Sequence, residues 1–454
     1  MLPERFEERM KNILGADYAD FAAALSEPSV RGVRVNETKI SVSDYLTASE
    51  LSLSPIAYAP DGFIPECADG VGTLAEHHAG MIYVQDPGAM ATVNALDVQR
   101  GWRVLDSCAA PGGKSSQIAS RIGDEGFLLS NEYVPKRAKI IVSNFERLGI
   151  KNAIVTSYDT AKFAEMFESF FDLVLCDAPC SGEGMFRKYD AALSEWSEEN
   201  IANSARRQRE ILDNLAPLVR EGGYLLYSTC TYAPEENEEN IAYFLGKHND
   251  YKLTPVSETL LPYTADGLPA SGLSAEQSRM CRRFYPHIAK GEGQFVALLQ
   301  RTDAPTDEFL YKDESAPLSR SETRVVDAFF KEVMATAPRG RLIKQGGYAV
   351  LLPHSCPIPK YSVFMSGVTI GEIKGDRLLP HHQFFSAYGR DMNLQENLKK
   401  GDPRVAKYLR GEEIPTDQKK SGWCAVLYEG VPLGGGKISD GRLKNHYPKG
   451  LRNN

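Results

Sequence analysis

The pattern of apolar and polar positions changes character along this chain of 454 residues. Up to about residue 75, a helical pattern (MLPERFEERMKNILG) is followed by the short apolar run RGVRVN and by a stretch broken by Pro and Gly. From about residue 100, short apolar runs alternate with segments whose apolar positions recur every three or four residues. Strands that alternate with helices are typical of a doubly wound, mostly parallel sheet. We therefore predict an α/β fold with a Rossmann-like core.

The elements of this core can be placed from the pattern. KSSQIASRI (114–122) is a predicted helix, and so is PKRAKIIVSNFERLGI (135–150), which has Pro135 near its start and Gly149 at its end. GEGQFVALLQR (291–301) is predicted as the last strand of the sheet. The preceding strands are predicted at WRVLDS (102–107), GFLLSNEY (126–133), AIVTSYD (153–159), FDLVLCDAP (171–179) and GGYLLYSTC (222–230).

A polar, Pro-bearing stretch separates this core from the C-terminal third. It predicts a linker over residues 303–318, after an N-terminal segment (1–75) and the core (76–302). TRVVDAFFKEVM then has a helical pattern, and short apolar runs broken by Gly and Pro follow. We predict a helical and mixed connecting region over 319–369 and a small β module over 370–454.

The net charge of −8 argues against a protein that simply coats nucleic acid. An RNA enzyme needs only one basic face, however, and each basic cluster can equally be a solvated surface. The candidate patches are Arg206, Arg207 and Arg209; Arg282 and Arg283; and Lys437, Arg442, Lys444, Lys449 and Arg452.

Cysteine usage and hydropathy predict the compartment. No apolar stretch approaches the roughly 20 residues of a membrane span, and the first residues lack the apolar block of a signal peptide. Eight cysteines without a regular framework fit a reducing compartment. No Cys-x-x-Cys pair has a matching second pair or histidines, which argues against a metal site. We expect a cytoplasmic protein without a membrane or metal partner.

A glycine-bearing loop follows the first core strand, which ends at Asp106. Glycines let a backbone approach a ligand closely, and the helix that starts at once offers free N–H groups. A phosphate-binding loop would need Gly six positions before the lysine and a free amide at the proline position, and this loop has neither. The predicted cofactor loop comprises Cys108, Ala109, Ala110, Pro111, Gly112, Gly113 and Lys114.

Acidic residues follow the other core strands. Glu132 lies eighteen residues beyond Lys114, the spacing at which a carboxylate accepts hydrogen bonds from a ribose. Asp159 follows the third strand, where it can receive the exocyclic amine of a base, and Asp177 follows the fourth. A single strand-end Asp is often only a helix cap. Together with Asp106, these residues predict a nucleoside ligand that carries hydroxyls, amines and a cationic part.

Two cysteines fall at the same edge of the predicted sheet. Cys180 follows the fourth strand and Cys230 follows the fifth, whereas Cys176 lies inside a strand and is predicted to be a core residue. A thiolate beside a methyl donor suits cytosine, because its addition to carbon 6 makes carbon 5 nucleophilic enough to attack a methyl sulfonium. Asp177 is the candidate acid near ring nitrogen 3. The residues alone do not decide which cysteine attacks.

At these residues the chain resembles the NOL1/NOP2/Sun family of RNA 5-methylcytosine methyltransferases. The matching segments cover roughly residues 1–301, with Asp86 where the family often has Glu; the opening LPERFEERM and RGVRVN resemble its RNA-contacting segment. The motifs are YVQDPGAM (83–90), LDSCAAPGGKSSQIA (105–119), NEY (131–133), CDAPCSGEGMFRK (176–188), LLYSTCTYAPEENEENI (225–241) and FYPHIAKGEGQFVA (284–297).

The resemblance implies a class I methyltransferase core, S-adenosyl-L-methionine as cofactor and a role for each motif residue. Cys230 would be the nucleophile, Cys180 would release the product, and Asp177 would lie between cofactor and target base. The loop from Cys108 to Lys114 would wrap the methionine part of the cofactor. Glu132 would hold the ribose with help from Arg137, and Asp159 would lie by the adenine.

The last thirty residues resemble the end of a bacterial 16S rRNA methylase of this family, which carries a PUA-like RNA-binding module there. This resemblance favours 16S rRNA in the small ribosomal subunit as the partner over tRNA. A tRNA methylase of the same family and a non-catalytic ribosome-assembly factor are the alternatives.

Overall fold

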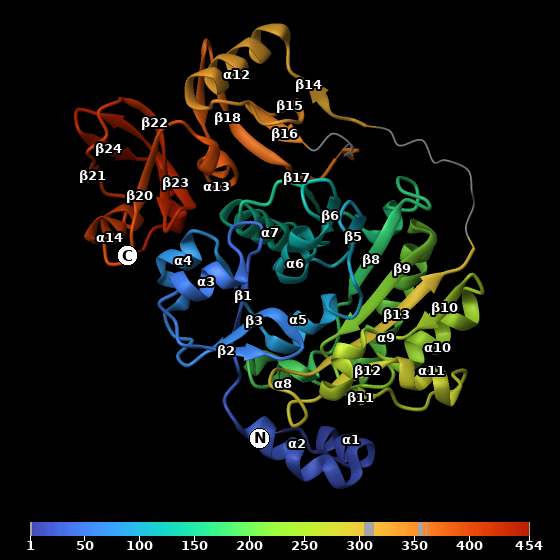
Figure 1. The fold of residues 1–454 in the computed structure, drawn as a ribbon. Helices are drawn as coiled ribbons and strands as arrows, with labels where there is room; N and C mark the ends of the chain where they lie inside the picture. Colours follow the sequence, from blue (N-terminus) through green and yellow to red (C-terminus); the bar gives the residue numbers. More distant parts are fainter. Residues whose placement is uncertain (1, 304–312, 353–356, 360, 454) are drawn as a thin grey trace.

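The computed structural model describes residues 2–303, 313–352, 357–359 and 361–453 (Figure 1). Most of the predicted linker, residues 304–312, lies outside the described residues. Strands within the described ranges form four sheets: a ten-stranded sheet in the core, a four-stranded sheet before it and two five-stranded sheets after it.

The N-terminal part consists of two helices and a small antiparallel sheet. The helix predicted from the first residues is α1 (Glu4–Leu14), and α2 (Tyr18–Ser26) follows it. The sheet has the order β2-β3-β1-β4, with short helices between and after its strands. These elements are β1 (Gly32–Val35), α3 (Val42–Ala48), β2 (Leu53–Ile56), β3 (Ala59–Pro65), α4 (Ala75–His78), β4 (Ile82–Gln85) and α5 (Pro87–Val93).

The predicted doubly wound sheet is confirmed in the core. Its central strands run parallel in the order β9-β8-β5-β6-β7. From β5 the chain winds outward first through β6 and β7 and then, on the other side, through β8 and β9, so the switch point lies between β5 and β8. The strands are β5 (Arg103–Asp106), β6 (Phe127–Asn131), β7 (Ala153–Thr156), β8 (Phe171–Asp177) and β9 (Val219–Thr229).

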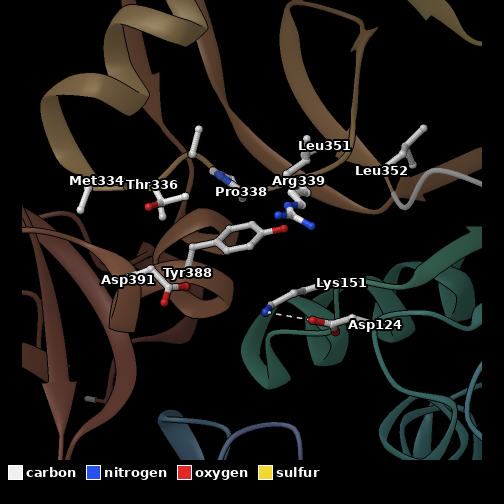
Figure 2. Close-up of a pocket in the computed structure, with 12 residues that line it drawn as sticks. Asp124, Lys151, Met334, Thr336, Pro338, Arg339, Leu351, Leu352, Tyr388 and Asp391 are labelled. Carbon is white, nitrogen blue, oxygen red and sulfur yellow. Dashed lines mark ion pairs between the residues drawn. The ribbon is translucent and has the colours of Figure 1, made fainter.

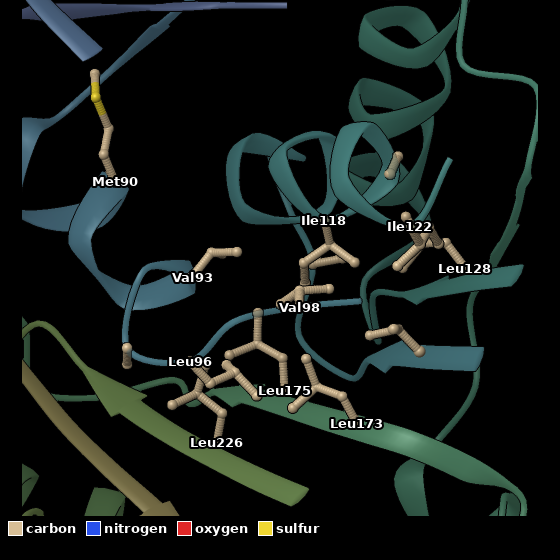
Figure 3. Close-up of a cluster of buried hydrophobic side chains, with 14 of the residues drawn as sticks. Met90, Val93, Leu96, Val98, Ile118, Ile122, Leu128, Leu173, Leu175 and Leu226 are labelled. Carbon is tan, nitrogen blue, oxygen red and sulfur yellow. The ribbon is translucent and has the colours of Figure 1, made fainter. Parts of the chain in front are cut away.

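Both faces of this sheet are buried, because successive residues of one strand enter different apolar clusters. Leu173 and Leu175 of β8 pack in one cluster, whereas Val174 between them packs in another. Figure 3 shows the first cluster, in which Leu128 and Leu226 from the sheet meet Ile118 and Ile122 of a helix. The helices of the core are α6 (Gly113–Ile122), α7 (Pro135–Leu148), α8 (Asp190–Ser194), α9 (Glu198–Leu215), α10 (Glu238–Lys247) and α11 (Ala275–Met280).

Antiparallel strands extend the sheet at both edges. Beyond β9 lie β13 (Gln294–Arg301), β12 (Arg282–Phe284) and β11 (Ala265–Asp266), while β10 (Tyr251–Thr254) also pairs with β13. At the opposite edge, β17 (Val363–Ser366) pairs with β7. The prediction that residues 291–301 form the last strand of the sheet was therefore wrong, because a segment more than sixty residues later adds one more strand.

The C-terminal third forms two further sheets. The first has the order β14-β15-β16-β18-β19 and is covered by α12, whose capping box joins Ser319 and Glu322. The predicted boundary at 369/370 falls inside β18, so this sheet continues past it. Its elements are β14 (Ala316–Pro317), α12 (Arg320–Val333), β15 (Arg341–Gln345), β16 (Tyr348–Leu352), β18 (Val368–Lys374) and β19 (Arg377–Pro380).

The second of these sheets packs against the N-terminal sheet, as Figure 1 shows beside its blue strands. Leu398, Tyr408 and Val426 share one buried cluster with Val33 and Phe63. Its order is β20-β22-β23-β24-β21, with α13 (His382–Tyr388) before it and α14 (Pro403–Leu409) inside it. The strands are β20 (Gln395–Leu398), β21 (Ile414–Pro415), β22 (Gly422–Tyr428), β23 (Val431–Ser439) and β24 (Arg442–Asn445). None of the helices in the described ranges combines the length and the apolar composition of a membrane span.

Candidate active site

A cavity of about 490 Å³ opens at the carboxyl ends of β5 and β8, on either side of the switch point. Open α/β sheets bind their ligands at this position. Arg31, Gln85, Lys188 and Tyr189 lie on the side toward the N-terminal segment. Of the predicted site residues, Cys108, Ala109, Ala110, Pro111, Gly113, Lys114 and Asp177 line the cavity together with Asp106, and Gly112 lies within the same loop.

Asp106 gives this cavity a buried carboxyl group. Its Oδ2 accepts a hydrogen bond of 2.6 Å from Ser115 Oγ, and its Oδ1 has no hydrogen-bond partner among the described residues. Burial raises the pKa of Asp106 to about 7, and the nearby charge of Asp177 adds to the rise. A buried carboxyl oxygen without a partner is suited to a cationic ligand that carries N–H donors, such as the amino group of S-adenosylmethionine.

Lys114 and Asp177 form an ion pair across the cavity. Lys114 Nζ lies 2.7 Å from Asp177 Oδ2, and Gln294 Nε2 lies 3.4 Å from Asp177 Oδ1. Burial alone would lower the pKa of Lys114, but the Asp177 carboxylate outweighs it, so the pKa is raised. The loop lysine is therefore held as an ammonium that faces the last acidic residue of β8.

Arg34 supports the cofactor loop from behind. Although it belongs to RGVRVN, which resembles an RNA-contacting segment, its side chain is buried. Its Nη2 donates to Ser116 Oγ at 2.7 Å and to Gly113 O at 3.3 Å, and its Nε donates to Gln85 Oε1 at 3.0 Å. Arg34 is thus unable to contact RNA, and its contacts hold the start of α6 instead. No signal in the sequence identified it, because the loop that covers it comes eighty residues later.

The other predicted cofactor residues lie outside this cavity. Glu132 is buried. Its carboxylate accepts a hydrogen bond from Val134 N at 3.0 Å and forms an ion pair of 3.3 Å with Arg137. Asp159 is exposed, and its side chain accepts from Ala161 N at 3.0 Å as the cap of a short 3₁₀ helix. In this structure Asp159 therefore acts as the helix cap that the sequence offered as its alternative role.

The two predicted cysteines lie side by side. Cys180 Sγ and Cys230 Sγ are 3.3 Å apart, although neither lines the cavity described above. Gly184 N donates to Cys230 O at 2.8 Å, and a Cβ at Gly184 would come within 2.8 Å of that same oxygen. This close approach explains why the second glycine of CSGEG, Gly184, has no side chain. Cys176, predicted as a core residue, is fully buried.

The state of Cys180 depends on its neighbour. The hydrogen bond with Cys230, together with burial, raises the pKa of Cys180 well above its ordinary value. Cys180 therefore keeps its proton, and its thiol can donate to the Cys230 sulfur. Among the described residues no group of three or more His, Cys, Asp or Glu side chains is placed to hold a metal ion.

One of the predicted basic patches is not a surface. Arg282 and Arg283 are buried, with Arg282 Nη2 donating to Thr264 O at 2.9 Å and Arg283 Nε to Glu238 Oε1 at 2.6 Å. The interpretation of this pair as an RNA-docking patch was wrong, because both guanidinium groups are used inside the protein. Arg206 and Arg207 are exposed.

A second cavity, of about 550 Å³, lies between the core and the sheet that contains β16 (Figure 2). Lys151 and Asp124 form an ion pair of 3.6 Å on its floor, and Tyr388 and Arg339 lie across from them. None of the predicted site residues lines it, so the candidate active site is the cavity at the ends of β5 and β8.

Comparison with known protein families agrees with this geometry. Residues 93–300 match the family described as 16S rRNA methyltransferase RsmB/F, and residues 2–87 match the N-terminal domain of 16S rRNA methyltransferase RsmF. Residues 395–453 match the methyltransferase RsmF PUA domain, in agreement with the small β module predicted at the C-terminus.

Individual relatives extend over nearly the whole chain. Ribosomal RNA small subunit methyltransferase F of Klebsiella pneumoniae is 33% identical over 99% of this chain and 96% of its own. The same-named protein of Escherichia coli O157:H7 is 32% identical over 99% of this chain and 96% of its own.

Two solved structures share the fold. A methyltransferase homolog protein from Pyrococcus horikoshii has 30% identity and a TM-score of 0.56, and the match covers 63% of this chain and 91% of that one. NSun6 from Pyrococcus horikoshii, solved with SFG, has 22% identity and a TM-score of 0.57 over 66% of this chain and 98% of that one. The chain belongs to the family of ribosomal RNA small subunit methyltransferase F, among the S-adenosylmethionine-dependent methyltransferases of the NOL1/NOP2/Sun group.

Proposed function

We propose that this methyltransferase acts on carbon 5 of cytosine in RNA, through a covalent thioether on Cys230. The observation that carries the proposal is the thiol pair of Cys180 and Cys230, with sulfurs 3.3 Å apart. Cys180 follows β8, which ends at Asp177, and Cys230 follows the neighbouring strand β9. Carbon 5 of cytosine is too weak a nucleophile to attack a methyl sulfonium until a thiolate has added to carbon 6, so a thiol pair suits this methyl acceptor.

S-adenosylmethionine, when bound, supplies the methyl group. We propose that the loop from Cys108 to Lys114 and Asp106 hold its methionine part, and that Glu132, oriented by Arg137, holds its ribose. Asp159 would lie by the adenine only after releasing the backbone N–H that it now caps.

The Cys230 thiolate adds to carbon 6, so that a C–S bond forms, the π bond between carbons 5 and 6 breaks, and electron density moves to carbon 5 and ring nitrogen 3. We assign to Asp177, in its protonated form, the hydrogen bond to ring nitrogen 3, and to the Lys114 ammonium, 2.7 Å from Asp177, the balance of the charge that develops. After methyl transfer, the proton on carbon 5 must leave so that the C–S bond breaks and the double bond re-forms.

Two features favour Cys230 over Cys180 as the nucleophile. The hydrogen bond with Cys230, together with burial, raises the pKa of Cys180, so Cys180 keeps its proton and its thiol can donate to the Cys230 sulfur. The charge of Cys230 contributes to that rise, and once Cys230 is bound as a thioether this opposition disappears. Cys180 can then lose its own proton, and its thiolate can take the proton from carbon 5. The alternative, in which Cys180 attacks, requires a thiol whose pKa is raised to lose its proton first.

We propose 16S rRNA as the substrate, since the relatives are named ribosomal RNA small subunit methyltransferase F. The C-terminal RsmF PUA match and the exposed Lys437 and Lys444 on its sheet support an RNA-binding role for residues 395–453. We keep the order of N-terminal segment, core, linker and C-terminal modules as part of the proposal. We place the end of the N-terminal segment after β4 instead of at residue 75, the end of the linker before β14 instead of at residue 318, and the start of the last module after β19.

Bisulfite sequencing of rRNA and tRNA from cells with and without the gene tests this function. We expect one or more cytosines of 16S rRNA to lose modification when the gene is deleted, and to regain it with the wild-type gene but not with Cys230→Ala. A change confined to tRNA would favour the tRNA methylase. No change in any cytosine would contradict the proposal and favour a non-catalytic assembly factor.

A further inference from the structure

We infer that Glu236 and Glu183 share a single buried proton through the hydroxyls of Ser181 and Thr231, and that this chain fixes the spacing of the two reactive cysteines. The cysteine loops concerned are residues 178–188, which hold Cys180, and residues 229–238, which hold Cys230. Both glutamates are positioning residues in this inference, which rests on the proposed function only for its kinetic test.

The two loops exchange carboxyl groups. Glu236, from the second loop, accepts from the backbone N–H of Ser181 at 3.0 Å and contacts Ser181 Oγ. Glu183, from the first loop, accepts from Thr231 Oγ1 at 3.0 Å and from Tyr232 N at 2.9 Å. Each loop therefore carries a carboxyl group that binds the other loop just after its cysteine. Glu236 binds Ser181, which follows Cys180, and Glu183 binds Thr231 and Tyr232, which follow Cys230.

Two hydroxyls complete a continuous chain between these carboxyl groups. Ser181 Oγ and Thr231 Oγ1 lie 2.9 Å apart, so the order is Glu236 Oε1, Ser181 Oγ, Thr231 Oγ1, Glu183 Oε2. All four side chains are buried, with Glu236 fully inaccessible. The chain contains three oxygen–oxygen contacts at hydrogen-bond distance, and each contact needs one hydrogen.

Counting these hydrogens shows that one carboxyl group must be protonated. The hydroxyls of Ser181 and Thr231 supply two hydrogens for the three contacts. If both glutamates were ionised, each hydroxyl would donate to its own carboxylate, and the Ser181–Thr231 contact would join two lone pairs. A third hydrogen, on Glu236 or on Glu183, satisfies every contact and removes one buried charge.

The donors around each glutamate place this hydrogen on Glu236. Glu183 accepts from three donors, because Trp196 Nε1 donates to its Oε1 at 2.9 Å in addition to Thr231 and Tyr232. Such a set stabilises a carboxylate.

Glu236 uses only Oε2 to accept N–H donors, from Ser181 N at 3.0 Å and from Gln208 Nε2 at 2.7 Å. Within the described part of the chain, its Oε1 contacts Ser181 Oγ alone and is the site left for the hydrogen.

The charges that face Glu236 agree with a neutral carboxyl group. Burial raises the pKa of Glu236 to about 7, and the charge of Glu183 raises it further. Burial also raises the pKa of Glu183, but its donors and the Arg9 guanidinium oppose that rise. On the other sides of Glu236 lie the Cys180 thiol and the hydroxyl of Tyr227, which donates to the Glu236 carbonyl at 2.6 Å. Among the described residues, no cation forms an ion pair with the Glu236 carboxyl group.

Loss of the shared hydrogen would act on the thiols. Ser181 directly follows Cys180 and Thr231 directly follows Cys230, so repulsion between their hydroxyl oxygens would push the two loops apart. The 3.3 Å separation of the sulfurs would then increase. In the proposed function, the Cys230 sulfur attacks carbon 6 and the Cys180 sulfur assists the release of the product from the same ring. The rates of both steps therefore depend on the distance between the two sulfurs.

Two isosteric substitutions test where the hydrogen lies. In Glu236→Gln the amide N–H₂ can replace the O–H toward Ser181, while the amide oxygen still accepts from Ser181 N and Gln208. In Glu183→Gln one accepting oxygen becomes a donor that faces Trp196 or Thr231. We therefore expect kcat for cytosine methylation to fall at least about tenfold further in Glu183→Gln than in Glu236→Gln, with KM for RNA little changed in either. Glu239→Gln, an exposed neighbour, is the matched control.

An infrared difference spectrum reads the hydrogen directly and does not depend on catalysis. The spectrum of the wild-type protein minus that of Glu236→Gln should show a carboxylic acid C=O band at neutral pH, and the spectrum of the wild-type protein minus that of Glu239→Gln should show none. If Glu183→Gln does not fold, Thr231→Val breaks the chain without altering a carboxyl group, and its kcat should fall similarly.

Equal losses in the two Gln variants, the reverse order, a normal kcat in Thr231→Val, or an unchanged band in Glu236→Gln would overturn the inference. If wild-type protein methylates no cytosine, the proposed function fails, and the infrared band still decides whether the hydrogen is present.

Discussion

Replacing Arg283 with methionine should destabilise the core strongly, because it breaks a buried ion pair behind the Cys230 loop. Arg283 and Glu238 are 2% and 1% exposed, and Arg283 binds both carboxylate oxygens. Arg283 Nη1 also donates to Tyr232 O at 2.8 Å, two residues beyond Cys230. Removing one partner of such a pair leaves a buried charge and costs about 3–5 kcal/mol. For a core of this size, that corresponds to a fall in Tm of roughly 6–20 °C.

Urea unfolding followed by circular dichroism measures this loss. Arg442→Met is the matched control, because Arg442 and its partner Glu413 are largely exposed and their pair contributes at most about 1 kcal/mol. The double variant Arg283→Met/Glu238→Gln removes the stranded charge and should recover roughly half of the loss or more. A loss below about 1 kcal/mol in Arg283→Met, or no recovery in the double variant, would refute the reasoning.

Three further variants probe the cofactor site and the C-terminal sheet. Glu132→Ala should weaken the binding of S-adenosylmethionine by about 1–3 kcal/mol, because hydrogen bonds to the ribose are lost, and its dissociation constant should rise accordingly. Unchanged binding by calorimetry would remove Glu132 from the site. Lys437→Gln/Lys444→Gln should weaken RNA binding and reduce the slope of log affinity against log salt by about 0.9 per lost phosphate contact. An unaltered slope would assign these lysines to a surface without RNA. Asp106→Asn should flatten the pH dependence of stability: the folded pKa of Asp106, about 7, lies above its unfolded value, so wild-type stability falls as pH rises toward 7. Parallel pH curves for variant and wild type would contradict a buried, neutral Asp106.

The parallel core could be predicted from the sequence because its strands are buried on both faces. Runs such as FLLSN and FDLVLCD carry apolar residues at successive positions, and turn residues bound each run. The strand ends then placed Asp106, Asp177, Cys180 and Cys230 at one edge of the sheet. That prediction used only strand direction, which the winding of the chain determines.

What the sequence missed depended on contacts between distant segments. In Val33-Arg34-Val35 the alternation suggests an outward-facing arginine, but the start of α6 covers that face. The strand β17 adds to β7 across more than two hundred residues, which no local pattern encodes. Asp159 follows its strand as predicted, but its carboxylate accepts a hydrogen bond from the backbone N–H of Ala161, two residues later.

The glutamates of the cysteine loops illustrate the same limit. EENEEN reads as a solvated acidic run, yet Glu236 and Glu238 from it are buried, one against Ser181 and the other against Arg283. A charge pattern along the chain cannot reveal this burial, because the partners come from separate strands and loops.

Covalent trapping on an RNA that carries 5-fluorocytosine at the target tests the central claim most directly. Fluorine cannot leave carbon 5 as a proton does, so the attacking cysteine stays bound to carbon 6 and the protein–RNA adduct appears as a slow band on a denaturing gel. We expect the adduct with wild-type protein and with Cys180→Ala, and none with Cys230→Ala. On unmodified RNA, Cys180→Ala alone should accumulate the adduct, because it attacks but does not release. A stable adduct in Cys230→Ala, or none in Cys180→Ala with the fluorinated RNA, would contradict Cys230 as the nucleophile.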